Sequence, residues 1–182
     1  MKKIPTIFVR DMTRQPAVVT PQWKHGCEWV RDGEGVATLK HDGTSCLVRA
    51  GRLFKRREIK PGQAAPPDFE LADLDEATGK TVGWVPVIVG HPDDRYHLEA
   101  FAAAGDIADG TYELMGPKIQ GNKGCFNTHV LVPHGQEPLD DAPRTFEGLR
   151  TWLETKLIEG VVWHHADGRA AKIKRRDFGI RW

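Results

Sequence analysis

Short runs of β-branched and aromatic residues, separated by Gly, Pro, Asn and Asp, recur along the 182-residue chain and predict many short strands. Asp42-Gly43 and Ala50-Gly51 are typical turn residues, so the apolar runs on either side of each pair are expected to form neighbouring strands. The predicted strands span residues 36–39, 45–48, 52–56, 82–89, 112–115, 128–132, 160–163 and 170–174.

Two longer segments have the spacing of helices instead. Asp93 or Asp94 is expected to cap a helix through residues 96–104, which Gly105 ends. Thr145 is expected to cap a second helix. Its apolar residues recur at helical spacing and predict a core-facing stripe of Phe146, Leu149, Leu153 and Leu157.

Residues 61–80 interrupt this pattern. They contain Pro66-Pro67 and most of the clustered acidic residues, and they predict an irregular insertion, not a domain boundary. No internal repeat or low-complexity tract is present. We therefore predict an α+β fold with antiparallel β-sheets flanked by helices, in a single domain over residues 1–182.

Charged residues are unevenly distributed along the chain. Lys and Arg number 26 against 25 Asp and Glu, so a net charge of +1 produces no global field for a nucleic-acid partner. Residues 49–60 and 169–182 are nevertheless strongly basic. Each of these segments is either a phosphate-binding footprint or a solvated strand.

The cysteines and the N-terminus indicate a cytoplasmic protein. Cys27, Cys46 and Cys125 are odd in number and far apart, which argues against a disulfide framework. The apolar run at residues 4–9 is too short for a signal core, and no segment is apolar enough to span a membrane.

Lysines stand out at two places. Lys40 opens the turn-like Lys40-His41-Asp42-Gly43 after an apolar run. Lys172 and Lys174 are two residues apart in a predicted strand, so both side chains are expected on one face, with Ile173 packed into the core on the other. Two fixed ammonium groups on one face are suited to stabilising a transferring phosphoryl group.

Two acids accompany these lysines. Glu159 precedes the apolar Gly160-Val161-Val162-Trp163, and Glu113 lies in a strand that leads into a Gly/Pro/Asn loop over residues 116–122. The order and character of these segments resemble the nucleotidyltransferase motifs of covalent polynucleotide ligases, in particular the small stand-alone ATP-dependent RNA ligases. The resemblance covers residues 35–178. It implies an ATP-grasp-like nucleotidyltransferase domain.

The resemblance implies an activity and its chemistry. The expected enzyme is an ATP-dependent RNA ligase that uses Mg²⁺, or alternatively Mn²⁺, and joins 5′-phosphate and 3′-hydroxyl RNA ends through a covalent lysyl-AMP. Lys40 would be the nucleophile, Lys172 and Lys174 would contact the phosphates, and Glu159 would orient the metal-bound water shell and help to position Lys40. The implied metal-binding residues are Glu159 and Glu113, and Glu113 would also hold the ribose.

The resemblance also implies which residues form the nucleotide site. Arg57 is favoured over Arg56 and Arg52 as the arginine that contacts the ribose or a phosphate. Lys118 and Asn122 are expected to line the nucleotide or RNA path. The cofactor-binding set is Thr38, Leu39, Lys40, Asp42, Gly43, Arg57, Glu113, Lys118, His134, Lys172 and Lys174.

Several alternatives stay open. A DNA ligase or a GTP-dependent capping enzyme would share the lysine chemistry, and a protein AMP-transferring enzyme would transfer the nucleotide to a protein. A non-catalytic RNA-binding module is the alternative without an enzyme. We expect no appended OB-fold or C-terminal domain, a monomer or a homodimer, and a role such as RNA repair.

Overall fold

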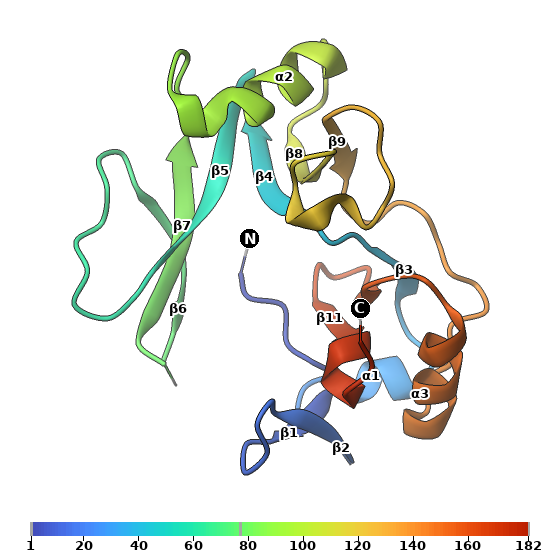
Figure 1. The fold of residues 1–182 in the computed structure, drawn as a ribbon. Coiled ribbons are helices and arrows are strands. Elements are labelled where there is room, and N and C mark those ends of the chain that lie inside the picture. Colours follow the sequence, from blue (N-terminus) through green and yellow to red (C-terminus); the bar gives the residue numbers. More distant parts are fainter. Residues whose placement is uncertain (1, 77, 182) are drawn as a thin grey trace. The chain divides into compact units, whose positions relative to one another are not determined.

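The computed structural model describes residues 2–76 and 78–181, and the chain divides into two compact units. One unit contains Asp42–His134 together with the first residues of the chain, and we call it the Glu113 unit. The other contains Ile4–His41 and Gly135–Trp182, and we call it the Lys40 unit. Figure 1 labels most of the helices and strands of both units.

The Glu113 unit is built on a six-stranded antiparallel sheet in the order β6-β7-β5-β4-β8-β9. Its helical elements are η1 (Pro92–Asp94), α2 (Arg95–Ala104) and η2 (Gln120–Asn122). The strands are β4 (Thr44–Arg49), β5 (Arg52–Ile59), β6 (Glu70–Asp75), β7 (Lys80–Pro86), β8 (Gly110–Met115) and β9 (Val130–Pro133).

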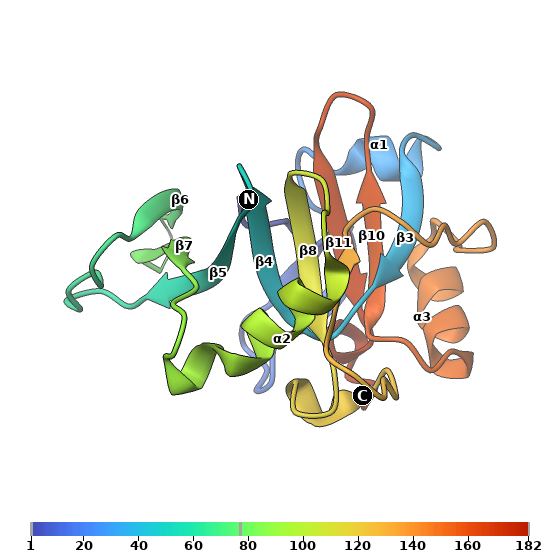
Figure 2. The same cartoon turned by 90° about the horizontal axis from the view of Figure 1, so that it is seen from above.

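Helix α2 packs on one face of this sheet, over β4 and β8 (Figure 2). Because side chains alternate between the two faces of a strand, the apolar residues that meet α2 are every second residue. The buried cluster contains Cys46, Val48, Leu53, Ala100, Tyr112 and Leu114. Ser45, Arg56 and Glu113 occupy intervening positions, so they lie on the opposite face of the sheet.

The Lys40 unit contains two smaller sheets. A hairpin is formed by β1 (Phe8–Asp11) and β2 (Val18–Trp23), and a three-stranded antiparallel sheet has the order β11-β10-β3. The strands of the second sheet are β3 (Val36–Lys40), β10 (Gly160–His164) and β11 (Ala170–Lys174). The helices are α1 (Glu28–Arg31), α3 (Phe146–Thr155) and η3 (Arg175–Phe178).

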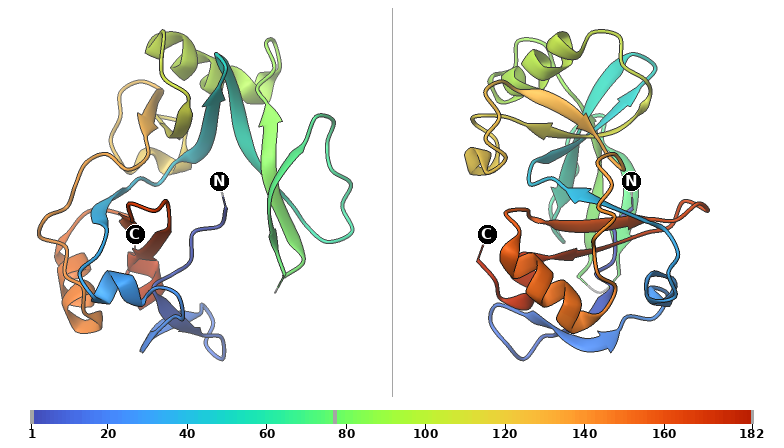
Figure 3. Two further views of the ribbon diagram at one scale, coloured as in Figure 1. Left: turned by 180° about the vertical axis from the view of Figure 1, so that it is seen from behind. Right: turned by 90° about the vertical axis from the view of Figure 1, so that its right-hand side faces the viewer.

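One face of the β3–β10–β11 sheet is the core of this unit. Helix α3 packs on this face (Figure 3), where Leu149 and Leu153 are buried with Trp163 and Ile173. The other face therefore carries the alternate residues of all three strands. They include Thr38, Lys40, Gly160, Val162, Lys172 and Lys174.

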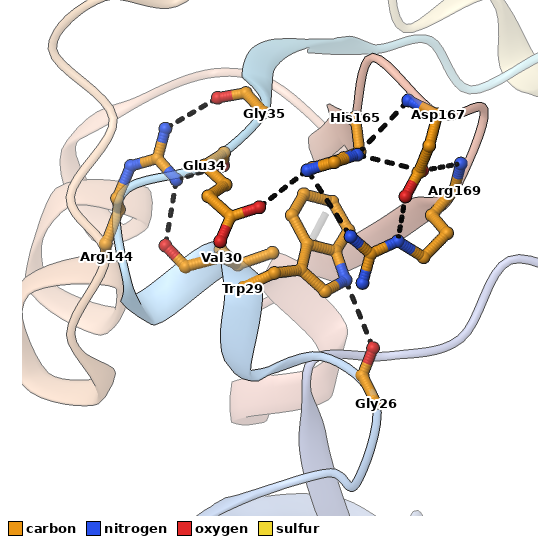
Figure 4. Close-up of polar contacts among 9 residues, drawn as sticks. All are labelled: Gly26, Trp29, Val30, Glu34, Gly35, Arg144, His165, Asp167 and Arg169. Carbon is orange, nitrogen blue, oxygen red and sulfur yellow. Dashed lines mark hydrogen bonds and ion pairs between the residues drawn. The ribbon is translucent and has the colours of Figure 1, made fainter.

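A charged network holds one end of the same sheet (Figure 4). His165, just after β10, contacts Glu34 through Nε2 at 2.6 Å and Asp167 through Nδ1 at 2.8 Å. Arg169 donates to Asp167 at 2.7 Å. Arg144 donates to the backbone carbonyl oxygens of Val30, Glu34 and Gly35. The network fixes the end of the sheet at which His164 pairs with Val36 and Ala170, whereas Lys40 and Lys174 lie at the other end.

Most of the predicted elements are confirmed. The antiparallel sheets with few helices confirm the α+β class, and β11 begins and ends at the predicted residues. Thr145 caps α3, accepting a hydrogen bond from the Gly148 N–H at 3.2 Å, and Gly105 ends α2. The single-domain organisation stays a prediction. Among the described residues, no helix is long and apolar enough to cross a membrane.

Three local predictions were wrong or incomplete. Residues 61–80 are not wholly irregular, because Glu70–Asp75 forms the edge strand β6. Leu157 does not join the stripe of α3, since the helix ends at Thr155 and Leu157 is 91% exposed. The hairpin β1–β2 was not predicted, although Phe8 is buried in the core.

Candidate functional site

Lys40 is the last residue of β3 and forms an ion pair within the Lys40 unit. Its Nζ lies 2.5 Å from Oε2 of Glu159, the residue just before β10, and also donates to the carbonyl oxygen of His41 at 3.2 Å. The Glu159 side chain is only 9% exposed. A buried carboxylate needs a cationic partner, so Glu159 fixes the lysine ammonium group in place.

Lys174 joins this pair from the other side of β10. In the sheet register, Gly160 pairs with Lys40 on one strand and with Lys174 on the other. The Lys174 Nζ is 3.8 Å from Oε1 of Glu159, so the carboxylate bridges two lysines. Lys172 occupies the next row of the same face, opposite Val162. The structure thus brings all four predicted catalytic residues together.

Gly160 lies between Lys40 and Lys174 in the sheet and has no side chain. A Cβ atom at this position would overlap the carbonyl oxygen of Ile173 and crowd the Cα atom of Lys174. The absence of a Cβ therefore lets β10 approach β11 closely at the end of the sheet that carries Lys40.

Burial and mutual repulsion lower the pKa values of Lys172 and Lys174. Burial, with the ammonium groups of Lys40 and Lys174, lowers the pKa of Lys172 from 10.5 to about 8, against the opposing effect of Asp177 and Glu159. Burial also lowers the pKa of Lys174, and Arg176 acts in the same direction. Such shifts are typical of cations concentrated where an anionic ligand would bind.

Lys172 is expected to titrate at a lower pH than the exposed lysines. Between pH 8 and 10.5 the unfolded chain holds this proton while the folded chain releases it, so Lys172 makes the free energy of unfolding rise with pH in that window. Titration of ¹³C-methylated lysines by NMR checks this, with Lys172→Arg assigning the resonance. A Lys172 resonance that titrates with those of the exposed lysines would contradict it.

Thr38 and Leu39 are already engaged within the sheet. Thr38 is buried, and its hydroxyl donates to the carbonyl oxygen of Val162 at 3.2 Å. The Leu39 N–H donates to the carbonyl oxygen of Glu137 at 3.0 Å. Contact of these residues with the nucleotide stays a prediction, and the Leu39 N–H already has an acceptor.

A second polar cluster lies in the Glu113 unit, around Glu113 itself. Glu113 is 9% exposed, and its Oε1 accepts the Gly43 N–H at 3.1 Å while its Oε2 lies 2.8 Å from Nε2 of His134. Strands β8 and β9 pair, which explains why residues far apart in sequence meet here. The cluster combines three members of the predicted cofactor-binding set, although sequence did not indicate the pairing of His134 with Glu113.

Gly43 has to be a glycine because it lies directly against β8. A Cβ atom at this position would overlap the carbonyl oxygen of Leu114 and the sulfur of Met115. The close approach of the two backbones is what lets the Gly43 N–H reach the Glu113 carboxylate.

Arg56, not Arg57, shares a sheet face with Glu113. The register pairs Cys46 with Lys55 and with Tyr112, so the residues next to Lys55 and Tyr112, which are Arg56 and Glu113, both face away from α2. Arg57 is exposed and faces the α2 side. Burial lowers the pKa of Arg56, and the carboxylates of Asp73 and Glu113 act in the opposite direction.

The remaining predicted residues lie on loops of the same unit. Asp42 is 3.6 Å from Nζ of Lys123, and Lys118 is exposed. Asn122 closes its own turn, because its side-chain amide both donates to and accepts from the Phe126 backbone at 2.9 Å. Asn122 therefore stabilises this loop, and the contact of Lys118 and Asn122 with a nucleotide or RNA stays a prediction.

The acids of these clusters suit Mg²⁺ only in part. Among the described residues, no group of three or more His, Cys, Asp or Glu side chains is arranged to hold a metal ion. Mg²⁺, however, is commonly held by one or two carboxylates together with substrate phosphates and water. The oxygens of Glu159 already contact Lys40 and Lys174, and those of Glu113 contact Gly43 and His134. Binding of Mg²⁺ at either carboxylate therefore stays a prediction.

Comparison with known proteins agrees with the resemblance to nucleotidyltransferases. A family model described as RNA ligase 1 matches residues 87–182, more than half of the chain, and this stretch includes Glu113, Glu159, Lys172 and Lys174. The chain belongs to the RNA ligase 1 family.

A relative from mouse extends the match to the whole chain, and two others match about half of it. RNA ligase 1 from Mus musculus is 25% identical over 265 residues, covering 100% of this chain and 81% of the mouse protein. RNA ligase 1 from Pongo abelii is 35% identical over 106 residues, covering 53% of this chain and 33% of that protein. RNA ligase 1 from Danio rerio is 32% identical over the same length, with the same coverage of each chain. The alignment with the mouse protein includes Lys40.

Proposed function

We propose that this protein is an ATP-dependent RNA ligase that joins a 5′-phosphate to a 3′-hydroxyl through a lysyl-AMP on Lys40. The observation that carries the proposal is the Glu159 carboxylate, which lies 2.5 Å from the Lys40 Nζ and 3.8 Å from the Lys174 Nζ. With Lys172 on the same face, the lysines outnumber their shared carboxylate. Such an excess of fixed positive charge suits a triphosphate. Family membership supports RNA as the substrate.

The first step transfers AMP to the protein. The neutral amine of Lys40 attacks the α-phosphorus of ATP, a nitrogen–phosphorus bond forms, and the bond from the α-phosphorus to the β-phosphate oxygen breaks. Pyrophosphate leaves, and the nitrogen gives up a proton to solvent. Lys172 and Lys174 stabilise the charge on the transferring group, and the covalent intermediate divides one difficult displacement into easier ones.

Two further steps consume the intermediate. An oxygen of the RNA 5′-phosphate attacks the α-phosphorus, the nitrogen–phosphorus bond breaks, and the Lys40 amine regains a proton. The RNA 3′-hydroxyl then attacks the activated 5′-phosphorus, loses its proton and expels AMP. Mg²⁺ bound to the triphosphate would neutralise part of its charge, with Glu159 as a ligand or as the acceptor for metal-bound water.

The clusters within each unit support specific roles in this proposal. Glu113 and His134 together form a polar site suited to the hydroxyls of a ribose. The antiparallel sheets support an ATP-grasp-like nucleotidyltransferase fold. A single domain, a monomeric or homodimeric state and a cytoplasmic location remain predictions.

Arg56 is expected to matter more than Arg57 for use of ATP. Replacing Arg56 with alanine removes a half-buried cation on the face of Glu113, so we expect the ATP concentration for half-maximal labelling to rise about tenfold. Arg57→Ala should change it by less than about twofold, because Arg57 is exposed on the other face. Titration of covalent labelling against ATP measures both, and the reverse order would return the role to Arg57.

The proposal is tested by a joining assay with matched substrates. Purified protein and Mg²⁺ are incubated with ATP or GTP and with nicked duplexes whose strands at the nick are RNA or DNA. Joining of 5′-phosphate RNA ends with ATP is the expected result. Joining of DNA alone would indicate a DNA ligase, and labelling by GTP alone a capping-type enzyme. RNA binding that survives Lys40→Ala, with no joining under any condition, would indicate a binding module.

A further inference from the structure

The N-terminal segment of the chain lies along the edge of the lysine strand β11 that does not pair with β10. The Ile7 N–H donates to the carbonyl oxygen of Lys172 at 2.9 Å, and the Lys172 N–H donates to the carbonyl oxygen of Pro5 at 2.9 Å. Thr6 is thereby bridged to Lys172 in parallel orientation. The backbone of Lys172 is therefore held on one side by β10 and on the other by residues 5–7.

Asp177 makes the corresponding contact for Lys174. This residue of η3 is 3% exposed, and its Oδ2 accepts the backbone N–H of Lys174 at 2.9 Å. Its Oδ1 accepts a hydrogen bond from Nη2 of Arg10, in β1, at 2.7 Å. Each carboxylate oxygen thus serves a different partner, one on the lysine strand and one on the hairpin.

The Arg10–Asp177 pair differs from an ordinary surface ion pair. A carboxylate as buried as Asp177 needs charge-assisted hydrogen bonds, and an arginine on a neighbouring strand supplies one. Arg14, on the same hairpin, offers a matched comparison. It contacts Asp11 at 3.7 Å, and both of those side chains are substantially exposed. Exposed ion pairs of this kind contribute little to stability. A comparison of Arg10 with Arg14 therefore compares an ion pair to a buried carboxylate with an ion pair on the surface.

We propose that Arg10 and Asp177 are positioning residues that hold Lys174 in place for nucleotidyl transfer. The chain of contacts runs from Arg10 to Asp177, to the backbone of Lys174, and from the Lys174 ammonium group to Glu159, which holds Lys40. The inference rests on the proposed function, and it assigns part of the site to the N-terminal hairpin. A small displacement of a positioned group is enough to slow a reaction strongly.

The test compares Arg10→Ala, Arg10→Lys and the control Arg14→Ala in the full chain. The rate of covalent labelling by α-labelled ATP is measured, together with hydrogen exchange of the Lys174 amide. Arg10→Ala is expected to label about tenfold more slowly and to exchange that amide faster. Arg10→Lys should recover most of the rate, since it restores a cation, whereas Arg14→Ala should match wild type.

Asp177→Asn provides a second variant in case Arg10→Ala fails to fold. It retains the shape of the side chain but removes the charge that attracts Arg10, and a similar slowing is expected. Wild-type labelling rates in both Arg10→Ala and Asp177→Asn, with an equally protected Lys174 amide, would overturn the inference. If the wild-type protein is not labelled at all, the proposed function fails instead, and the amide exchange still shows whether the contact holds Lys174.

Discussion

Replacing Lys40 with arginine is expected to abolish covalent nucleotide labelling while leaving the fold intact. Arginine keeps the positive charge that pairs with Glu159, so the ion pair of the Lys40 unit is retained. Its guanidinium stays protonated, and it cannot serve as the nucleophile. Loss of the nucleophile should lower the labelling rate by at least about 10⁴-fold, which places it below detection.

The matched control for this prediction is Lys24→Arg. Lys24 is an exposed lysine of the same unit, and its replacement should leave labelling unchanged. Thermal unfolding of all three proteins confirms that the loss is chemical. Label retained by Lys40→Arg at a rate near that of wild type would show that another residue is the nucleophile.

Glu159→Gln is the second variant for which we expect a large effect. The amide keeps the shape of the side chain but removes the charge that lies between the ammonium groups of Lys40 and Lys174. We expect the labelling rate at saturating ATP and Mg²⁺ to fall about 100-fold, comparable to the loss of one preorganised electrostatic group in an active site.

Glu154→Gln provides the control for Glu159→Gln. Glu154 is in α3 of the same unit and forms an exposed ion pair with Arg150 at 3.6 Å. Removing its charge should change the labelling rate by less than about twofold, as expected for a surface pair. Labelling by Glu159→Gln within about threefold of wild type would assign the bridging carboxylate a structural role only.

The lysine strand β11 was predictable because its information is local. Residues two apart in a strand share a face, so the spacing of Lys172, Ile173 and Lys174 placed the lysines together and the isoleucine in the core. The structure confirms both, with Ile173 fully buried. The partner of Lys40 was expected to be Glu159 from the family resemblance, and the contact between them is present.

The contacts that sequence did not indicate depend on strand register. Arg56 and Arg57 must lie on opposite faces of β5, but only the pairing of β4 with β5 and with β8 decides which of them shares a face with Glu113. The contact of His134 with Glu113 likewise depends on the pairing of β8 with β9. Register is set by the whole sheet, and no local pattern encodes it.

Long-range polar contacts could not be predicted from the sequence either. Arg10 and Asp177 are separated by 167 residues, and each looks like an ordinary charged residue in its own segment. The edge strand β6 was overlooked because its acids and the adjoining Pro66-Pro67 resemble a loop. Charged residues are common on edge strands, where they discourage pairing with other chains.

Intact-mass measurement of the protein after incubation with ATP and Mg²⁺, followed by peptide mapping, tests most directly whether Lys40 is the nucleophile. We predict a mass increase of one AMP, located on the peptide that contains Lys40 and lost when RNA with 5′-phosphate and 3′-hydroxyl ends is added. No increase in mass with ATP, or an AMP located on a different residue, would contradict the claim that Lys40 is the nucleophile of an RNA ligase.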